Sequence, residues 1–184
     1  MLDLAAMVLA MTANGNDAVR IGRALPPENY TATAARGAAL FETAMLQGHA
    51  SARAEHALPP LRWNPELAAA AHEWAQQLAA SGGFEHSDDD SDDPQGENLW
   101  MGTRGAFAYP EMVKHWVDEK ADFLPGRPLE ASGRKGWEDI AHYTQIVWKD
   151  TREVGCAVAS NAEDDYLVCR YYPAGNVEGE TPLG

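Results

Sequence analysis

Apolar side chains recur at helical spacing between residues 64 and 82. Asn64 is a favourable N-cap, and Pro65 suits the first helical position. An apolar stripe then runs from Leu67 to Leu78 at intervals of three and four residues. Gly82 follows the last apolar position, as is typical of a helix C-terminus. The pattern therefore predicts a helix that begins at Pro65 and ends before Gly82.

Three further helices are expected. The Ala-rich stretch from about 35 to 56 favours a helix, and Leu40, Ala44, Gln47 and Ser51 trace one narrow face of it. A second begins near Pro110 and ends around residue 123, and a short one covers residues 137–145.

Strands are expected only in the last third of the chain. Residues 154–159 and 166–172 are rich in β-branched and aromatic side chains and flank a polar turn, which is the pattern of a hairpin. The short apolar run at residues 146–148 also predicts a strand. Helices first and strands last indicate an α+β fold with an antiparallel sheet.

The length and composition fit one globular domain: 184 residues, 45% of them hydrophobic and 23% charged. The 28 acidic residues outnumber 14 Lys and Arg, giving a net charge of -14. A negative net charge does not suit a protein that binds nucleic acid or an anionic membrane surface. No apolar run approaches the roughly 20 residues needed to span a bilayer.

The chain has two cysteines, Cys156 and Cys169, one on each arm of the hairpin. If the turn centres between Ala162 and Glu163, the two lie directly opposite one another, close enough for a disulfide. Two buried free thiols are the alternative that the sequence leaves open. A disulfide would indicate a protein outside the cytosol.

The first 34 residues form a leader and linker by composition, and the domain is expected over residues 35–184. The apolar block at residues 4–10 is similar to part of a signal peptide, but it lacks a basic start. A short helix or a disordered end is the alternative. The oligomeric state has no signal in the sequence.

Five motifs occur in one order between Phe41 and Val177. Residues 141–151 read AHYTQIVWKDT, residues 166–177 read YLVCRYYPAGNV, residues 96–99 read GENL and residues 61–67 read LRWNPEL. The fifth pairs His49 with Arg53. Together they resemble the CAP superfamily of cysteine-rich secretory proteins, antigen 5 and pathogenesis-related proteins. Two positions depart from its pattern, Ala141 for Gly and Ala50 for Asn.

The resemblance implies a three-layer α-β-α sandwich around a small antiparallel sheet, secretion and the Cys156–Cys169 bridge. Because the family's other cysteines are absent, a minimal member of the bacterial type is expected. The resemblance also carries over a cavity lined by His86, Glu97, Glu119 and His142, which lie too far apart in sequence for spacing alone to assemble them.

Two imidazoles and two carboxylates suit a divalent metal, zinc first and calcium or magnesium as alternatives. With only two His ligands the site would be loose and open to water, and the Glu side chains would orient the rings. A hydrogen-bonded network without metal is the structural alternative. A metal-dependent hydrolase is another, with Glu97 or Glu119 as general base, although no HExxH or Gly-x-Ser-x-Gly motif is present.

The remaining candidates have plainer interpretations. Trp100, Met101, Phe107 and Tyr109 could edge an apolar groove for a small lipid or sterol, but ordinary packing is favoured. The acidic run at residues 88–93 could bind calcium, but a solvated loop is favoured. We therefore expect a secreted CAP-domain protein that acts by binding a lipid, a glycan or an extracellular protein partner.

Overall fold

A five-stranded sheet with the order β1-β3-β5-β4-β2 forms the middle layer of the domain. The structure is a computed structural model and describes residues 23–26, 36–88 and 94–184. The strands are β1 (Arg23–Ala24), β2 (Arg62–Trp63), β3 (Gly96–Thr103), β4 (Glu153–Ser160) and β5 (Asp164–Tyr172). The helices are α1 (Ala38–Ala54), α2 (Pro65–Ser81), α3 (Tyr109–Asp118) and α4 (Ala141–Ile146), with short 3-10 turns η1 (Glu119–Asp122), η2 (Leu129–Ala131) and η3 (Glu138–Ile140).

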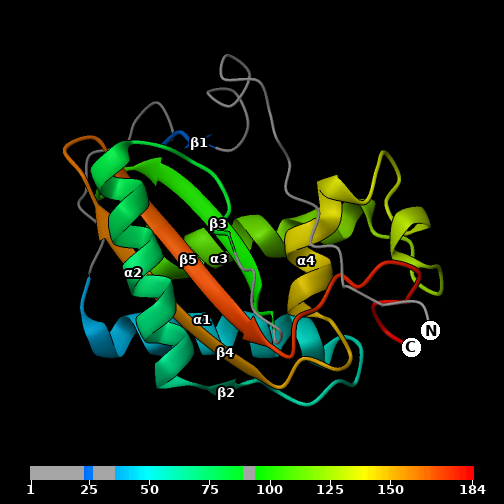
Figure 1. The fold of residues 1–184 in the computed structure, drawn as a ribbon. Coiled ribbons are helices and arrows are strands. Elements are labelled where there is room, and N and C mark those ends of the chain that lie inside the picture. The colour runs from blue at the N-terminus through cyan, green and yellow to red at the C-terminus, as the bar shows by residue number, and fades with distance from the viewer. Residues whose placement is uncertain (1–22, 27–35, 89–93) are drawn as a thin grey trace.

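Helices cover both faces of this sheet, which confirms the three-layer α-β-α fold. Figure 1 shows α2 across the near face, with α1 and α3 behind the strands. Leu99 and Val168 pack with α2 on one face, whereas Trp100 and Leu167 pack with α1, α3 and α4 on the other. Strands buried on both faces do not alternate between apolar and polar residues. This explains why β3 was missed as a strand in the sequence.

The sheet is antiparallel only at its centre. Strand β5 pairs antiparallel with β3 and with β4, but the two-residue edge strands β1 and β2 pair in parallel with β3 and β4. The expected antiparallel sheet is therefore correct for the three long strands, and the complete sheet is mixed. The edge strands differ because neither is joined to its neighbour by a hairpin, the connection that makes antiparallel pairs.

The predicted α2 is confirmed from end to end. The Asn64 side chain accepts hydrogen bonds from the backbone nitrogens of Glu66 at 2.8 Å and Leu67 at 3.3 Å. Gly82 closes the helix with a φ of 71°, a conformation that glycine adopts without steric cost.

The buried face of α1 differs from the expected one. Leu40 is exposed, and the face turned to the core instead carries Phe41, Met45, His49 and Arg53 together with Ala44 and Ala52. The larger Phe41 and Met45 side chains decide which side of the helix is buried, because they remove more apolar area from water than alanines do.

The strand predicted at residues 146–148 is wrong. Ile146 ends α4, and Val147 and Trp148 continue into a turn whose side chains are fully buried. A short apolar run signals burial without distinguishing strand from helix. Here the carbonyls of Ile146 and Trp148 accept hydrogen bonds from the Arg53 guanidinium instead of a neighbouring strand.

The hairpin and its register are confirmed. Cys156 lies opposite Cys169, with 4.1 Å between their Cα atoms, and the two form a disulfide. The alternative of two free thiols is therefore wrong for this structure. The bridge joins β4 and β5, and both cysteines lie in the part of the core that also contains α1.

Part of the segment expected to be leader and linker pairs with the sheet. Arg23 and Ala24 lie beside Met101 and Gly102 of β3, and Arg23 Nε donates to Asp164 Oδ1 at 2.7 Å. Residues 1–22 and 27–35, which include the signal-like block, lie outside the described residues. Within the part that is described, no helix is both long and apolar enough to cross a membrane.

Replacing Arg53 tests how much its buried guanidinium contributes to stability. It donates to four carbonyl groups, those of Pro59, Ile146, Trp148 and Thr151. Arg53→Met leaves these carbonyls without that donor, so we expect the free energy of unfolding in urea to fall by about 3 kcal/mol or more. The matched control is Arg62→Met, which removes an exposed ion pair with Glu153 and should cost about 1 kcal/mol or less. Equal losses in both variants would contradict this role.

Candidate functional site

His86 and Glu97 form the first of two His–Glu pairs. His86 follows α2 in the chain, Glu97 is the second residue of β3, and His86 Nδ1 lies 2.6 Å from Glu97 Oε1. A carboxylate only accepts, so Nδ1 carries the hydrogen. In the neutral ring the lone pair is then on Nε2, which takes no part in this bond.

Glu97 is held by more than the histidine. Ser87 donates to it twice at 3.1 Å, from its backbone nitrogen and from its hydroxyl. Arg170 Nε lies 3.0 Å from Glu97 Oε2. This contact is an ion pair without hydrogen-bond geometry. Arg170 Nη2 donates to the Ser87 hydroxyl at 2.5 Å. The serine next to His86 therefore supports the carboxylate and does not form a Ser–His pair.

His142 and Glu119 form the second pair. His142 Nδ1 donates to Glu119 Oε1 over 2.6 Å, and the backbone nitrogen of Tyr143 donates to Oε2 at 3.0 Å. The Trp116 ring stacks on the imidazole, with centroids 5.9 Å apart and an interplanar angle of 17°. As in the first pair, Nε2 is left outside the bond to the carboxylate.

The start of β3 connects the two pairs. Successive side chains of a strand point to opposite faces, so Glu97 lies on the α2 face of the sheet and Asn98 on the other. Asn98 Nδ2 donates to the carbonyl of His142 at 3.0 Å. The first pair is therefore built on one face and the second on the opposite face, and both approach this end of β3.

The structure joins the four predicted residues as two hydrogen-bonded pairs, His86 with Glu97 and His142 with Glu119. No group of three or more His, Cys, Asp or Glu side chains is placed to hold an ion in residues 23–26, 36–88 and 94–184. Two open hollows of about 500 and 430 Å³ border α2, and the described residues that line them include none of the four.

The other predicted residues fall into the core or onto the surface. Trp100, Phe107 and Tyr109 are buried, and Met101 packs on the opposite face from Trp100, which favours packing over a shared lipid groove. His72, on α2, is exposed. Most of the acidic run, residues 89–93, lies outside the described residues.

The sequence model of the cysteine-rich secretory protein family, CAP, matches residues 46–171. The chain belongs to this family. It is 37% identical over 138 residues to pathogenesis-related protein 1A of Nicotiana tabacum, covering 74% of this chain and 77% of that protein. It is 38% identical over 127 residues to venom allergen 5.02 of Vespa crabro, covering 65% and 59%. A crystal structure of NaASP2 with Zn2+ shares the fold, with a TM-score of 0.66, 24% identity and coverage of 85% of this chain and 88% of that one.

Sequence reasoning assigned no role at the site of this CAP domain to Arg170, Asn98 or Tyr171. All three lie within motifs recognised as similar to the family, but a motif does not show which side chain points at another. The register supplies that information, because Glu97 lies opposite Arg170 and Asn98 opposite Cys169. A prediction of β3 together with its pairing to β5 would have found the Arg170 contact.

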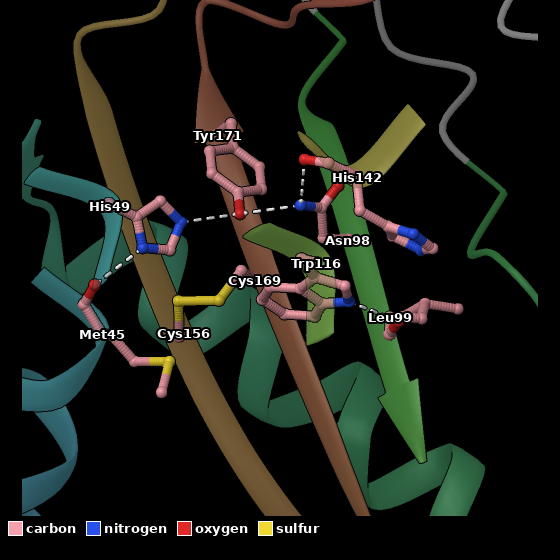
Figure 2. The surroundings of a disulfide bond; sticks show 9 residues. All are labelled: Met45, His49, Asn98, Leu99, Trp116, His142, Cys156, Cys169 and Tyr171. Carbon is pink, nitrogen blue, oxygen red and sulfur yellow. Dashed lines mark hydrogen bonds between the residues drawn. A yellow bond between two sulfur atoms is a disulfide. The ribbon is translucent and has the colours of Figure 1, made fainter. Parts of the chain in front are cut away.

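A buried chain of hydrogen bonds extends from the second pair to α1 (Figure 2). Asn98 Nδ2 donates to the Tyr171 hydroxyl at 3.1 Å. The same hydroxyl lies 2.8 Å from His49 Nε2. On the other side of the ring, His49 Nδ1 lies 2.7 Å from the Met45 carbonyl. A carbonyl only accepts, so Nδ1 is protonated, and neutral His49 accepts at Nε2 from the tyrosine. Every donor direction in this chain is then determined.

Burial sets the protonation states in this chain of bonds. It lowers the pKa of His49 to about 4, with the bond to Met45 opposing the shift and the charge of Arg53 adding to it. Burial also raises the pKa of Tyr171 well above its usual value, although the bond from Asn98 acts in the opposite direction. Both side chains are therefore neutral near pH 7.

The stability of the domain should fall in mild acid because of His49. Unfolded His49 takes up a proton near pH 6.5, whereas the folded residue resists it until about pH 4. Its contribution is complete above pH 6.5 and is lost as the pH falls to 4, by about 3 kcal/mol in total. Urea unfolding between pH 7 and 4 measures this loss.

His49→Gln is the matched variant, because a neutral amide can also donate and accept. It should flatten the pH dependence of the unfolding free energy by that amount. If the variant and the parent lose stability in parallel as the pH falls, His49 does not carry the effect.

Proposed function

We propose that this CAP domain acts outside the cytosol as a binding protein that holds a divalent metal ion, preferably zinc, through Nε2 of His86 and of His142. Water would complete the coordination, so the site would be loose. The disulfide between Cys156 and Cys169 supports a location outside the reducing cytosol. A small lipid, a sterol or an extracellular protein partner stays a prediction from the resemblance.

One observation carries the metal proposal: in both pairs the imidazole donates Nδ1–H to a carboxylate over 2.6 Å. Histidines that bind metals commonly have this arrangement, in which a carboxylate fixes the tautomer and orients Nε2. The donor set therefore fits a borderline-soft ion such as zinc better than calcium or magnesium, which prefer oxygen ligands. A related fold crystallised with Zn2+ supports the same choice.

The geometry supports binding over hydrolysis. A general base needs a lone pair directed at the water that it deprotonates. Both oxygens of Glu97 and both oxygens of Glu119 already accept hydrogen bonds from the protein. Each carboxylate is therefore already engaged in orienting an imidazole, which favours binding over general-base catalysis.

Isothermal titration of metal-stripped protein with zinc tests the proposal. The parent protein should give saturable heat, and the His86→Ala/His142→Ala double variant should give none. Glu97→Gln or Glu119→Gln should weaken binding by about tenfold or more, because each removes the carboxylate that orients a ring.

His72→Ala is the control, because it removes an exposed histidine distant in sequence from both pairs. It should bind zinc as the parent does. A double variant that binds zinc with unchanged affinity would show that the assigned histidines are not the ligands.

A further inference from the structure

We infer that Arg170 makes the two histidines unequal metal ligands: through Glu97 it weakens His86 as a donor and leaves His142 as the stronger contact. This inference rests on the proposed metal binding and adds a positioning residue to it. Among the described residues, Arg170 forms no hydrogen bond or ion pair with either imidazole, and its contacts here are with the Glu97 carboxylate and Ser87.

The first carboxylate has its charge offset within the protein. Glu97 and Arg170 lie directly opposite one another on β3 and β5, and their side chains are only 7% and 9% exposed. Little water reaches this ion pair, so screening between the two charges is weak. With a neutral ring, the unit formed by His86, Glu97 and Arg170 has no net charge.

The second carboxylate has no such partner. Among the described residues, no Lys or Arg lies within ion-pair distance of Glu119, whose only ionisable partner is His142. The neighbouring Lys120 turns away and pairs with Glu55 at 2.8 Å. With a neutral ring, the unit formed by His142 and Glu119 has a net charge of about one negative unit.

This difference in net charge changes how strongly each Nε2 binds a cation. A fully charged carboxylate accepts the Nδ1–H bond more strongly and makes the opposite nitrogen a better electron donor. It also attracts the ion directly, whereas the paired charges of Glu97 and Arg170 largely cancel at that distance. His142 is therefore the stronger ligand, even though His86 is the more exposed of the two, at 55% against 31%.

Single variants test the inequality with Arg170 intact. Zinc affinity is measured by isothermal titration, or from histidine ring chemical shifts where binding is too weak for heat. His142→Ala should lose about tenfold more affinity than His86→Ala. Equal losses, or a larger loss for His86→Ala, would overturn the inference while leaving the metal site itself in place.

A gain of affinity assigns the effect to the charge of Arg170. In the His142→Ala background only His86 remains, and adding Arg170→Gln should strengthen its zinc binding by about tenfold. Arg170→Lys keeps the charge and should give no such gain. A purely structural role for Arg170 predicts weaker binding in both, and that result would overturn the inference.

A metal-free measurement separates this inference from the proposed function. Diethyl pyrocarbonate modifies unprotonated imidazole, and mass spectrometry at fixed alkaline pH follows each histidine. With Arg170→Gln, His86 should react several-fold faster than in the parent or in Arg170→Lys, and His142 should react at the parent rate. If the parent binds no zinc, the proposed function fails, and the modification rate of His86 alone tests the inference. A His86 rate in Arg170→Gln equal to that of the parent overturns it.

Discussion

The hydrogen bonds donated by the Arg53 guanidinium are the contacts on which the arrangement of this domain most depends. It is fully buried in α1 and faces carbonyl groups in place of a carboxylate, linking the helix to the turn after α1 and to the segment between α4 and β4. Burial lowers its pKa to about 10, with the charge of Arg152 adding to the shift, so the group stays charged at neutral pH. Since His142 lies on α4, this contact also fixes one half of the site relative to the sheet.

Strand β3 brings the other half into place. Its neighbour β5 supplies Arg170 on one face and Tyr171 on the other. Arg170 contacts Glu97 of the first pair, whereas Tyr171 accepts from Asn98, which also donates to the His142 carbonyl of the second pair. The Trp116 indole donates to the Leu99 carbonyl at 3.0 Å while its ring stacks on His142. The orientation of the second imidazole is thus tied to β3 as well, although Glu119 and His142 both come from helical segments.

The sequence predicted those parts of the fold that local chemistry determines. The cap at Asn64, the end at Gly82 and the register of Cys156 against Cys169 each depend on residues close in sequence or on a single turn. β3 and the false strand at residues 146–148 depend on burial from both sides, which short apolar runs do not resolve. The four site residues came from resemblance, and their division into two pairs required the positions of β3 and α4. The contact of Arg170 with Glu97 depends on cross-strand pairing, so it could not be predicted from the order of residues in the sequence.

Adjacent placement of Glu97 and Asn98 makes this end of β3 intolerant of changes in length. An insertion or deletion of one residue inside β3, at Gly96, would turn every following side chain to the opposite face. Arg170 would then meet an amide, and the carboxylate would enter the buried space beside Tyr171 and Cys169. Natural variation at this end of the strand should therefore occur by substitution, with length changes confined to the preceding loop.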